Sequence, residues 1–292
     1  MYVTADIPDA IATNMALNTS DSTSMRHLII AACFICLMTI TSCCGVIKTV
    51  VAHTDARDVP VRSFMLLASN TVFTDPGCIP PACNYHSIET NASSVLVGRS
   101  RSHPDRAFVL TAAHFCVSRF NPAPEGKVFI AHIFIAYDHM GRRHRAKFNT
   151  SSDTDDACVL TVYGVRDDVS IAELADDMPV IGERVFNAAA PKAFFAPGLV
   201  PLFDGLYSGA TQSGVSVFTI PTALGSSGSP VFDATGRIVG LIVGYPVLKK
   251  IDDLGDEIRV VENLAYAVPL ERLRDIVGVV MRDDLVATSS SP

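Results

Sequence analysis

Short apolar segments of strand length, separated by Gly, Pro and Asp, recur along most of the chain. Such segments are typical of β-strands, and their regular spacing favours a closed or sandwiched antiparallel architecture. We expect strands at residues 94–98, 108–111, 128–137, 157–162, 185–190, 215–220, 231–232, 238–243 and 259–268.

One segment has the pattern of an amphipathic helix. Leu270, Leu273 and Ile276 fall on one face, and a proline stands near the start, where helices tolerate it. The pattern predicts a short C-terminal helix over residues 269–277. We expect the tail, residues 281–292, to be disordered.

A targeting segment precedes the strands. Residues 28–40 form an unbroken apolar or small run after the basic Arg26. A helix of this length reaches about 20 Å, short of the roughly 30 Å hydrocarbon core, so the run suits a secretory signal. The Ile-Thr-Ser-Cys that ends at Cys43 resembles a bacterial lipobox, whose cysteine is lipidated. We therefore expect residues 25–44 to direct export and to leave the protein lipid-anchored at the periplasmic or extracellular face of a membrane.

An uncleaved membrane anchor that continues through Ile47 is the alternative for the same segment. Residues 1–24 are polar and unstructured by pattern, and we expect translation to begin at Met25. Both alternatives place the folded part in an exported location, which permits disulfides.

Four of the eight cysteines lie outside the targeting segment: Cys78, Cys83, Cys116 and Cys158. Cys78 and Cys83 enclose a short Pro-rich loop, and we expect them to form a disulfide. Cys116 and Cys158 either pair or remain buried thiols. No histidine or acidic cluster at metal-ligand spacing accompanies them, so we expect neither a metal site nor a cofactor.

The charge balance argues against a nucleic-acid partner. The 292 residues are 49% hydrophobic, enough for a core, and carry a net charge of -7. A phosphate-binding surface normally needs a concentrated positive field. The basic run Arg142–Lys147 is the local exception. It forms either a polyanion patch or, as the alternation of Ala146 and Phe148 favours, the polar face of a half-buried strand.

Residues 222–241, TALGSSGSPVFDATGRIVGL, place Ser227 at the start of a predicted β-hairpin. Gly225 and Gly228 beside it can take backbone angles that other residues avoid and let a ligand approach the main chain. A serine in such a loop becomes a nucleophile only when a base activates it.

A candidate base and acid lie upstream. The segment AFVLTAAHFC runs an apolar strand into His114, and SSDTDDACVL places Asp156 directly before another apolar strand. We interpret Asp153 and Asp155 as solvated loop residues, because they stand further from that strand.

The order of these residues, within LTAAHFC, DDACVL and GSSGSP, resembles the trypsin/chymotrypsin superfamily of serine endopeptidases. The segments IGERVFNAAAPK, GSSGSPVFDATGRIVGL and NLAYAVPLERLRDIV are similar to the HtrA-like and bacterial glutamyl-endopeptidase-like branch, although we expect no PDZ-like domain. The resemblance implies an all-β domain over residues 60–280. It consists of two six-stranded antiparallel β-barrels with a short C-terminal helix, and its site lies between the barrels.

The resemblance also implies roles for the candidate residues. Ser227 attacks the scissile carbonyl of a polypeptide substrate and forms an acyl-enzyme, His114 carries the proton, and Asp156 orients the imidazole. The backbone amides of Gly225 and Ser227 form the oxyanion hole. The chain departs from the family's histidine-loop disulfide, because the strand predicted at 94–98 contains no cysteine that could pair with Cys116.

The resemblance places the substrate pocket at uncharged positions. Without a carboxylate, a buried Lys or Arg side chain would be left unpaired, so we expect cleavage after small or medium apolar residues. The pocket positions are Pro221, Thr222, Ala223 and Leu224 on one wall and Val243, Gly244 and Tyr245 on the other.

Two other functions remain open from sequence. One is a catalytically silent member of the same fold that only binds its partner. The other is a membrane-tethered host-interaction protein in which hydrolysis is incidental. The oligomeric state is not indicated.

Overall fold

The computed structural model describes residues 58–78, 83–117, 123–252, 255–260 and 263–289. The predictions for residues 1–24 and 25–44, including lipidation of Cys43, lie outside these residues. No helix in the described part of the chain is long and apolar enough to cross a membrane.

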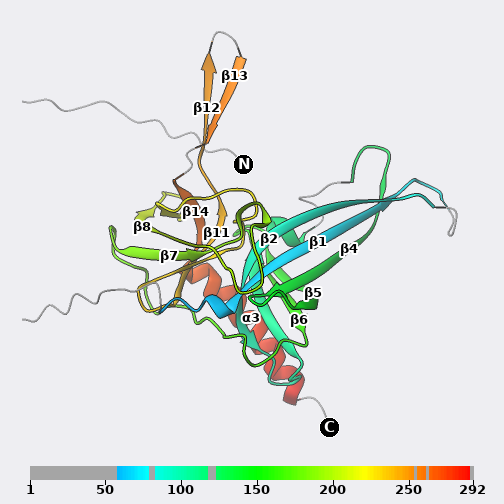
Figure 1. Cartoon of the computed structure of the whole chain (residues 1–292), viewed down its shortest axis with the longest axis horizontal. Helices are drawn as coiled ribbons and strands as arrows, with labels where there is room; N and C mark the ends of the chain where they lie inside the picture. The colour runs from blue at the N-terminus through cyan, green and yellow to red at the C-terminus, as the bar shows by residue number, and fades with distance from the viewer. Residues whose placement is uncertain (1–57, 79–82, 118–122, 253–254, 261–262, 290–292) are drawn as a thin grey trace, which may run out of the picture. The chain divides into compact units, whose positions relative to one another are not determined.

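The first six strands close into an antiparallel barrel in the order β1-β2-β3-β6-β5-β4 (Figure 1). Its interior is filled by a buried cluster that includes Met65, Leu96 and Leu160. After the short 3-10 helix η3 (Val61–Ser63), the strands are β1 (Phe64–Thr74), β2 (Tyr85–Arg99), β3 (Arg106–Ala112), β4 (Val128–Asp138), β5 (Arg143–Ser152) and β6 (Ala157–Tyr163).

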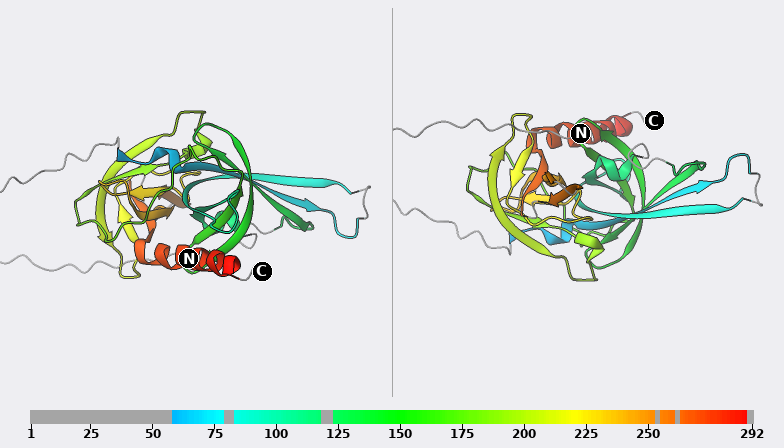
Figure 2. Two further views of the ribbon diagram at one scale, coloured as in Figure 1. Left: turned by 90° about the horizontal axis from the view of Figure 1, so that it is seen from below. Right: turned by 90° about the horizontal axis from the view of Figure 1, so that it is seen from above.

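Six later strands close a second barrel in the order β10-β11-β14-β9-β8-β7 (Figure 2). Phe218, Val231 and Val239 belong to its core. The strands are β7 (Arg184–Ala188), β8 (Leu202–Ala210), β9 (Ser216–Phe218), β10 (Pro230–Phe232), β11 (Ile238–Gly244) and β14 (Ala265–Pro269). A third cluster joins both barrels to helix α3 (Leu270–Ser289), so the predicted fold of two six-stranded barrels and a C-terminal helix is confirmed.

Two strands, β1 and β8, were not predicted from the sequence pattern. The middle of β1 carries polar residues, yet Ser69 and Thr71 are buried. The Ser69 hydroxyl is satisfied by a 2.7 Å hydrogen bond with Thr90. In β8, Asp204 and Gly205 resemble turn residues. The single strand predicted at 259–268 corresponds to two strands, because residues 259–260 end β13 (Gly255–Val260), which pairs with β12 (Val247–Asp252) in a separate hairpin, and residues 265–268 belong to β14.

Helix α3 continues beyond its predicted end at residue 277 and through most of the tail predicted to be disordered. The reason is tertiary contact with the first barrel. Val280 is buried, and the side chain of Met281 lies over Gly98. The Asp284 carboxylate accepts hydrogen bonds from the hydroxyls of Ser100 and Ser102 at 2.5 and 2.7 Å.

The basic run lies on β5, where His144 and Ala146 are buried between exposed neighbours. This alternation confirms the half-buried strand. The expectation that Phe148 also points inward is wrong, since 42% of it is exposed and the pairing with β6 shifts register after it.

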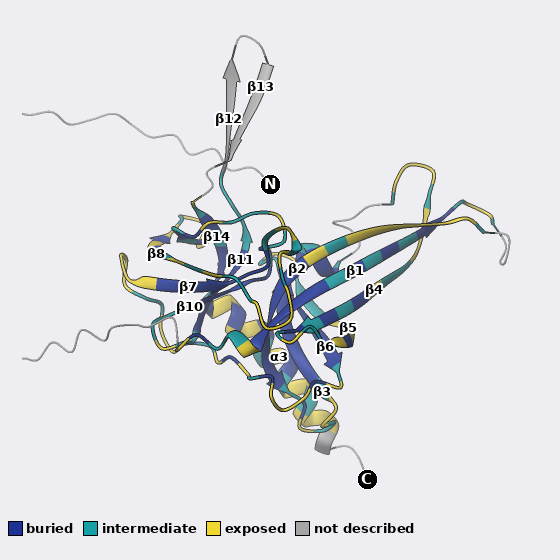
Figure 3. Cartoon of the chain, in the orientation of Figure 1, coloured by how far each residue is buried: buried dark blue, intermediate teal, exposed yellow. Residues whose placement is uncertain are grey.

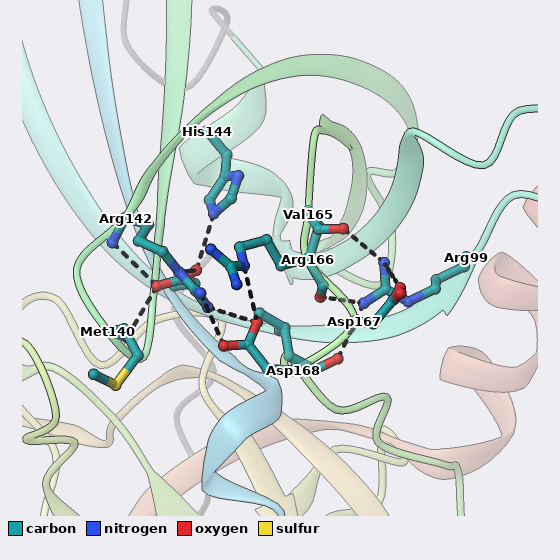
Figure 4. A network of polar contacts seen from close by, with 10 residues as sticks. Arg99, Met140, Arg142, His144, Val165, Arg166, Asp167 and Asp168 are labelled. Atoms are coloured by element: carbon teal, nitrogen blue, oxygen red, sulfur yellow. Dashed lines mark hydrogen bonds and ion pairs between the residues drawn. The ribbon is translucent and has the colours of Figure 1, made fainter.

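A buried carboxylate fixes the turn between β4 and β5 (Figure 4). Asp138 is fully buried and accepts hydrogen bonds from Arg142 Nε at 2.6 Å and His144 Nε2 at 3.0 Å. Arg142 in turn makes a bidentate pair with Asp168, at 2.8 and 2.9 Å. Burial raises the pKa of Asp138, but the hydrogen bonds from His144 and Arg142 outweigh it, so the pKa lies below its ordinary value.

The turn between β4 and β5 contacts the segment that precedes β8 of the second barrel. The N–H of Gly198 donates to the His139 carbonyl at 2.8 Å, and a Cβ at Gly141 would lie 2.7 Å from the Pro197 ring. Residues 197 and 198 follow closely on the 3-10 helix η5 (Pro191–Ala193), which lies at the cleft described below.

We predict that Asp138→Asn lowers the free energy of unfolding at neutral pH by about 2 kcal/mol, because it replaces the buried charged acceptor of the hydrogen bonds from Arg142 and His144 by a neutral amide. Since the folded-state pKa is depressed, this stabilisation is present above the ordinary pKa of 3.8 and is lost as the pH falls through the folded value. Urea unfolding of both proteins across this range measures it. A difference that stays constant down to acid pH would contradict the assignment.

Candidate active site

His114 stands where β3 ends and the single-turn helix α2 (Ala113–Cys116) begins. The fully buried Ala112 and Ala113 allow this turn to pack closely against β6. The N–H of Ala113 donates to the Asp156 carbonyl at 3.0 Å, which ties the start of α2 to the start of β6.

Asp156 holds His114 through two further hydrogen bonds. Its Oδ1 accepts the backbone N–H of His114 at 2.8 Å, and its Oδ2 lies 2.8 Å from the ring Nδ1. A carboxylate can only accept, so the proton of a neutral ring resides on Nδ1 and Nε2 is left as the basic nitrogen. Asp156 has a φ of 54°, which aspartate tolerates better than most residues.

The neighbouring aspartates have other partners. Asp155 accepts from the Ser152 hydroxyl at 2.5 Å and lies 3.6 Å from Arg272 Nε. The carboxylate of Asp153 accepts from Ser151 at 3.0 Å. Of the three candidate carboxylates, the structure therefore pairs Asp156 with the histidine.

Disulfides connect both pairs of cysteines that the sequence leaves available. Cys116 and Cys158, whose bonding was left open, are joined in the structure. Each stands two positions after a member of the His114–Asp156 pair, so the bond ties α2 to β6 beside the histidine. Cys78 and Cys83 are also joined, as the sequence favoured.

Ser227 lies in the loop before β10 and faces the same cavity as His114, with a volume of about 520 Å³. The loop needs its glycines. Gly225 has a φ of 93°, and a Cβ there would lie 2.7 Å from the Ala190 carbonyl oxygen. Gly228 has a φ of 82°, and a Cβ there would collide with the backbone of Ser93.

The amides of the loop differ in whether they are bonded within the protein. Ser226 N–H donates to Ala223 O at 2.9 Å, and Gly228 N–H donates to Ile242 O at 2.6 Å. The amides of Gly225 and Ser227 donate to no acceptor in the described part of the chain. Both residues line the cavity, and two amides that are not bonded within the described part of the chain suit a developing oxyanion.

The peptide bond before Gly225 is fixed by its carbonyl. Leu224 O accepts the N–H of Lys192 at 2.5 Å. Because the C=O and N–H of a trans peptide point in opposite directions, this bond directs the Gly225 N–H away from Lys192. Lys192 and Ala193 have φ values of 52° and 56°, so this turn of η5 is itself unusual.

Ser93, which the sequence analysis did not single out, braces the loop from the other barrel. It is fully buried on β2. Its hydroxyl donates to Gly225 O at 2.8 Å and accepts the Ala190 N–H at 2.9 Å. Its own N–H donates to Ser227 O at 2.9 Å. The residues that Ser93 contacts are far away in the sequence. The only local signal for its role was therefore weak: small residues that precede an apolar run.

The predicted pocket residues are only partly brought to this cavity. Leu224 lines it but is 74% exposed, so it forms no buried wall. Val243 packs against the core between the barrels instead. The hydroxyl oxygen of Thr222 is buried without a hydrogen-bond partner in the described part of the chain. The remaining predicted positions do not line the cavity: Pro221, Ala223, Gly244 and Tyr245.

Comparison with known proteins agrees with this architecture. Residues 92–241 match the sequence profile of the trypsin-like peptidase domain. The fold is similar to that in the crystal structure of the serine endoprotease from Yersinia pestis, with a TM-score of 0.52, 15% identity, and coverage of 80% of this chain and 67% of that chain. A search of curated proteins finds no match.

Replacing Cys116 and Cys158 together by alanine opens a cross-link that spans 42 positions. Chain-entropy arguments give a loss of unfolding free energy of about 4 kcal/mol for such a loop. The matched control replaces Cys78 and Cys83, which span 5 positions and should cost about 2 kcal/mol. Denaturant unfolding compares them, and an equal or smaller loss at Cys116–Cys158 would contradict the expected role of that disulfide.

Proposed function

Because the chain belongs to the trypsin-like peptidase family, we propose that it is a serine endopeptidase whose catalytic triad is Ser227, His114 and Asp156. The observation that carries the proposal is the doubly hydrogen-bonded His114–Asp156 pair, which stands at the same cavity as Ser227. The amides of Gly225 and Ser227, which have no acceptor among the described residues, supply the anion-binding element that acyl transfer requires.

In the acylation step, Ser227 Oγ forms a bond with the scissile carbonyl carbon while its proton passes to His114 Nε2. Asp156 stabilises the imidazolium that results. The N–H groups of Gly225 and Ser227 donate to the oxyanion of the tetrahedral intermediate. When the intermediate collapses, the C–N bond breaks and the leaving amine takes the proton from His114.

Deacylation repeats the sequence with water. Water gives its proton to His114 Nε2 and attacks the acyl carbon, and the same two amides hold the second oxyanion. The proton then returns to Ser227 Oγ as the acid product is released.

On the sequence pattern alone, we also propose that the enzyme acts on polypeptides after export and is attached to a membrane through Cys43. An apolar segment that ends in a lipobox-like motif supports this attachment.

The triad predicts large losses of activity without loss of fold. Ser227→Ala, His114→Ala and Asp156→Asn should each reduce the kcat of peptide hydrolysis by about 10⁴- to 10⁶-fold. The matched control is Asp155→Asn, which removes a neighbouring carboxylate that bonds Ser152 rather than His114. Steady-state assays measure kcat, and circular dichroism checks that each variant is folded. A large loss of kcat in Asp155→Asn with little loss in Asp156→Asn would assign the role in the triad to Asp155.

The cleavage preference follows from the charge of the pocket positions. None of Pro221, Thr222, Val243, Gly244 and Tyr245 is charged, so we expect cleavage after Ala, Val or Leu. Selectivity should be modest, since each methylene contributes about 1 to 3 kcal/mol in an apolar pocket. A peptide library digested by the purified domain measures this. A profile dominated by Arg, Lys or Glu before the cut would contradict it.

A further inference from the structure

The basic run on β5 places three cations in a row on the outside of the first barrel. Strands β4, β5 and β6 are neighbours there (Figure 3). Arg143, Arg145 and Lys147 are exposed, and the residues between them are buried. Because alternate residues of a strand face the same side of a sheet, the three side chains lie on one face. We call this row the basic stripe.

The basic stripe is not neutralised by ion pairs within the described part of the chain. Arg142, which directly precedes it, pairs with both Asp138 and Asp168. None of the three cations of the stripe makes such a pair with a described residue. Arg145 instead lies over the ring of Tyr163 on β6, 4.9 Å from its centroid, a contact that leaves the guanidinium charged. The stripe therefore concentrates positive charge on a chain whose net charge is -7.

Helix α3 brings acidic residues to one end of the stripe. Asp283 and Asp284 line a hollow of about 320 Å³ together with Lys147. Neither Arg143 nor Arg145 lines this hollow. The carboxylates of α3 therefore oppose the positive field at Lys147 more than at the two arginines.

Apolar side chains on β4 border the stripe. Ile135 pairs with Arg145 and Tyr137 with Arg143, and paired residues project from the same side of a sheet. Ile133, two positions before Ile135, faces this side as well and is 50% exposed. Cations beside aliphatic and aromatic side chains suit a membrane interface, where phosphates lie next to hydrocarbon. A nucleic-acid backbone offers the phosphates without the hydrocarbon, so it suits this surface less well.

We propose that the basic stripe docks the folded domain onto a membrane that contains anionic phospholipids. The proposal rests on the membrane attachment proposed above and adds which face of the domain lies on the lipid. Residues 44–57 connect Cys43 to residue 58, where the described structure begins, and a chain of that length spans at most about 50 Å. An attachment at Cys43 would thus keep the domain within reach of the lipid headgroups.

Charge complementarity sets the expected strength and orientation. Each Lys or Arg close to an anionic membrane favours binding about fivefold. The acidic remainder of the chain is repelled by the same surface, so docking should select the face that carries the stripe. Salt screens these interactions over a Debye length of about 3 Å at 1 M, so high salt should release the domain.

Tryptophan fluorescence of the full-length protein tests the docking. The chain contains no tryptophan, so a single introduced one reports on one position. Ile133→Trp places the reporter beside the stripe. The matched control is Val180→Trp, which places it before β7 of the second barrel, at a position that is 75% exposed. Each variant is reconstituted with vesicles of phosphatidylcholine alone or mixed with phosphatidylglycerol, both with brominated acyl chains that quench nearby tryptophan.

We expect phosphatidylglycerol to quench the Ile133→Trp reporter and to shift its emission to shorter wavelength, and about 1 M salt to reverse both effects. The Val180→Trp reporter should be quenched in neither vesicle. Quenching of both reporters by the anionic lipid, or equal quenching of Ile133→Trp in the two vesicles, would overturn docking through the stripe.

A second experiment changes the charge. Arg143→Gln with Arg145→Gln, added to the Ile133→Trp reporter, should lower the ratio of docked to undocked protein about 30-fold. The matched control removes two arginines of the second barrel, Arg184→Gln with Arg237→Gln, and should leave the ratio unchanged. Circular dichroism checks that each variant is folded. Equal losses in the two double variants would assign the effect to net charge and overturn the site.

The outcomes separate docking from attachment. Sedimentation of the full-length protein with neutral vesicles measures attachment alone, because the stripe has no anionic lipid to bind there. Failure to sediment overturns the attachment, whereas salt-sensitive quenching of Ile133→Trp by anionic vesicles would still support docking. If anionic lipid leaves this reporter unquenched while a double-stranded oligonucleotide shifts its emission, the stripe binds nucleic acid and membrane docking is overturned.

Discussion

The hydroxyl of Ser93 is the contact on which the geometry of the site depends, because it joins the two barrels at the loop that carries the nucleophile. One oxygen bonds Gly225 O and the Ala190 N–H, and the adjacent amide bonds Ser227 O. These three partners all belong to the second barrel, whereas Ser93 belongs to the first. Full burial excludes competing water from this contact.

The two halves of the site are each made rigid by a different device. In the first barrel, the Cys116–Cys158 disulfide and two hydrogen bonds that His114 donates to Asp156 fix the histidine. In the second barrel, two glycines at positive φ allow the loop to curl, and Lys192 fixes the peptide bond before Gly225. The buried Asp138 fixes the turn between β4 and β5 through its hydrogen bond from Arg142. The same turn accepts a hydrogen bond from the segment that follows η5. Proton transfer requires a fixed position of His114 relative to Ser227. The hydrogen bonds of Ser93 provide it by joining the first barrel to the Ser227 loop.

The sequence predicted the candidate triad because its three motifs have strong local signals, and the family resemblance that these motifs carry implied the two-barrel architecture. Ser227 lies in a run of small residues before a hairpin, and Asp156 is the acidic residue directly before a strand. The hydrogen bond from the Ser93 hydroxyl to Gly225 O could not be predicted in the same way, since the two residues are 132 positions apart in the sequence. The C-terminal part of α3 was missed for a similar reason, because Asp284 is satisfied by serines of the first barrel rather than by a local pattern.

The most direct test of the account is covalent labelling of the folded protein with a fluorophosphonate, followed by mass spectrometry of its peptides. The account predicts one phosphonyl group per chain, on Ser227 Oγ, and loss of that adduct when His114 is replaced by alanine. A folded protein that takes up no label, or that carries it on a different serine, would contradict the assignment of Ser227 as an activated nucleophile.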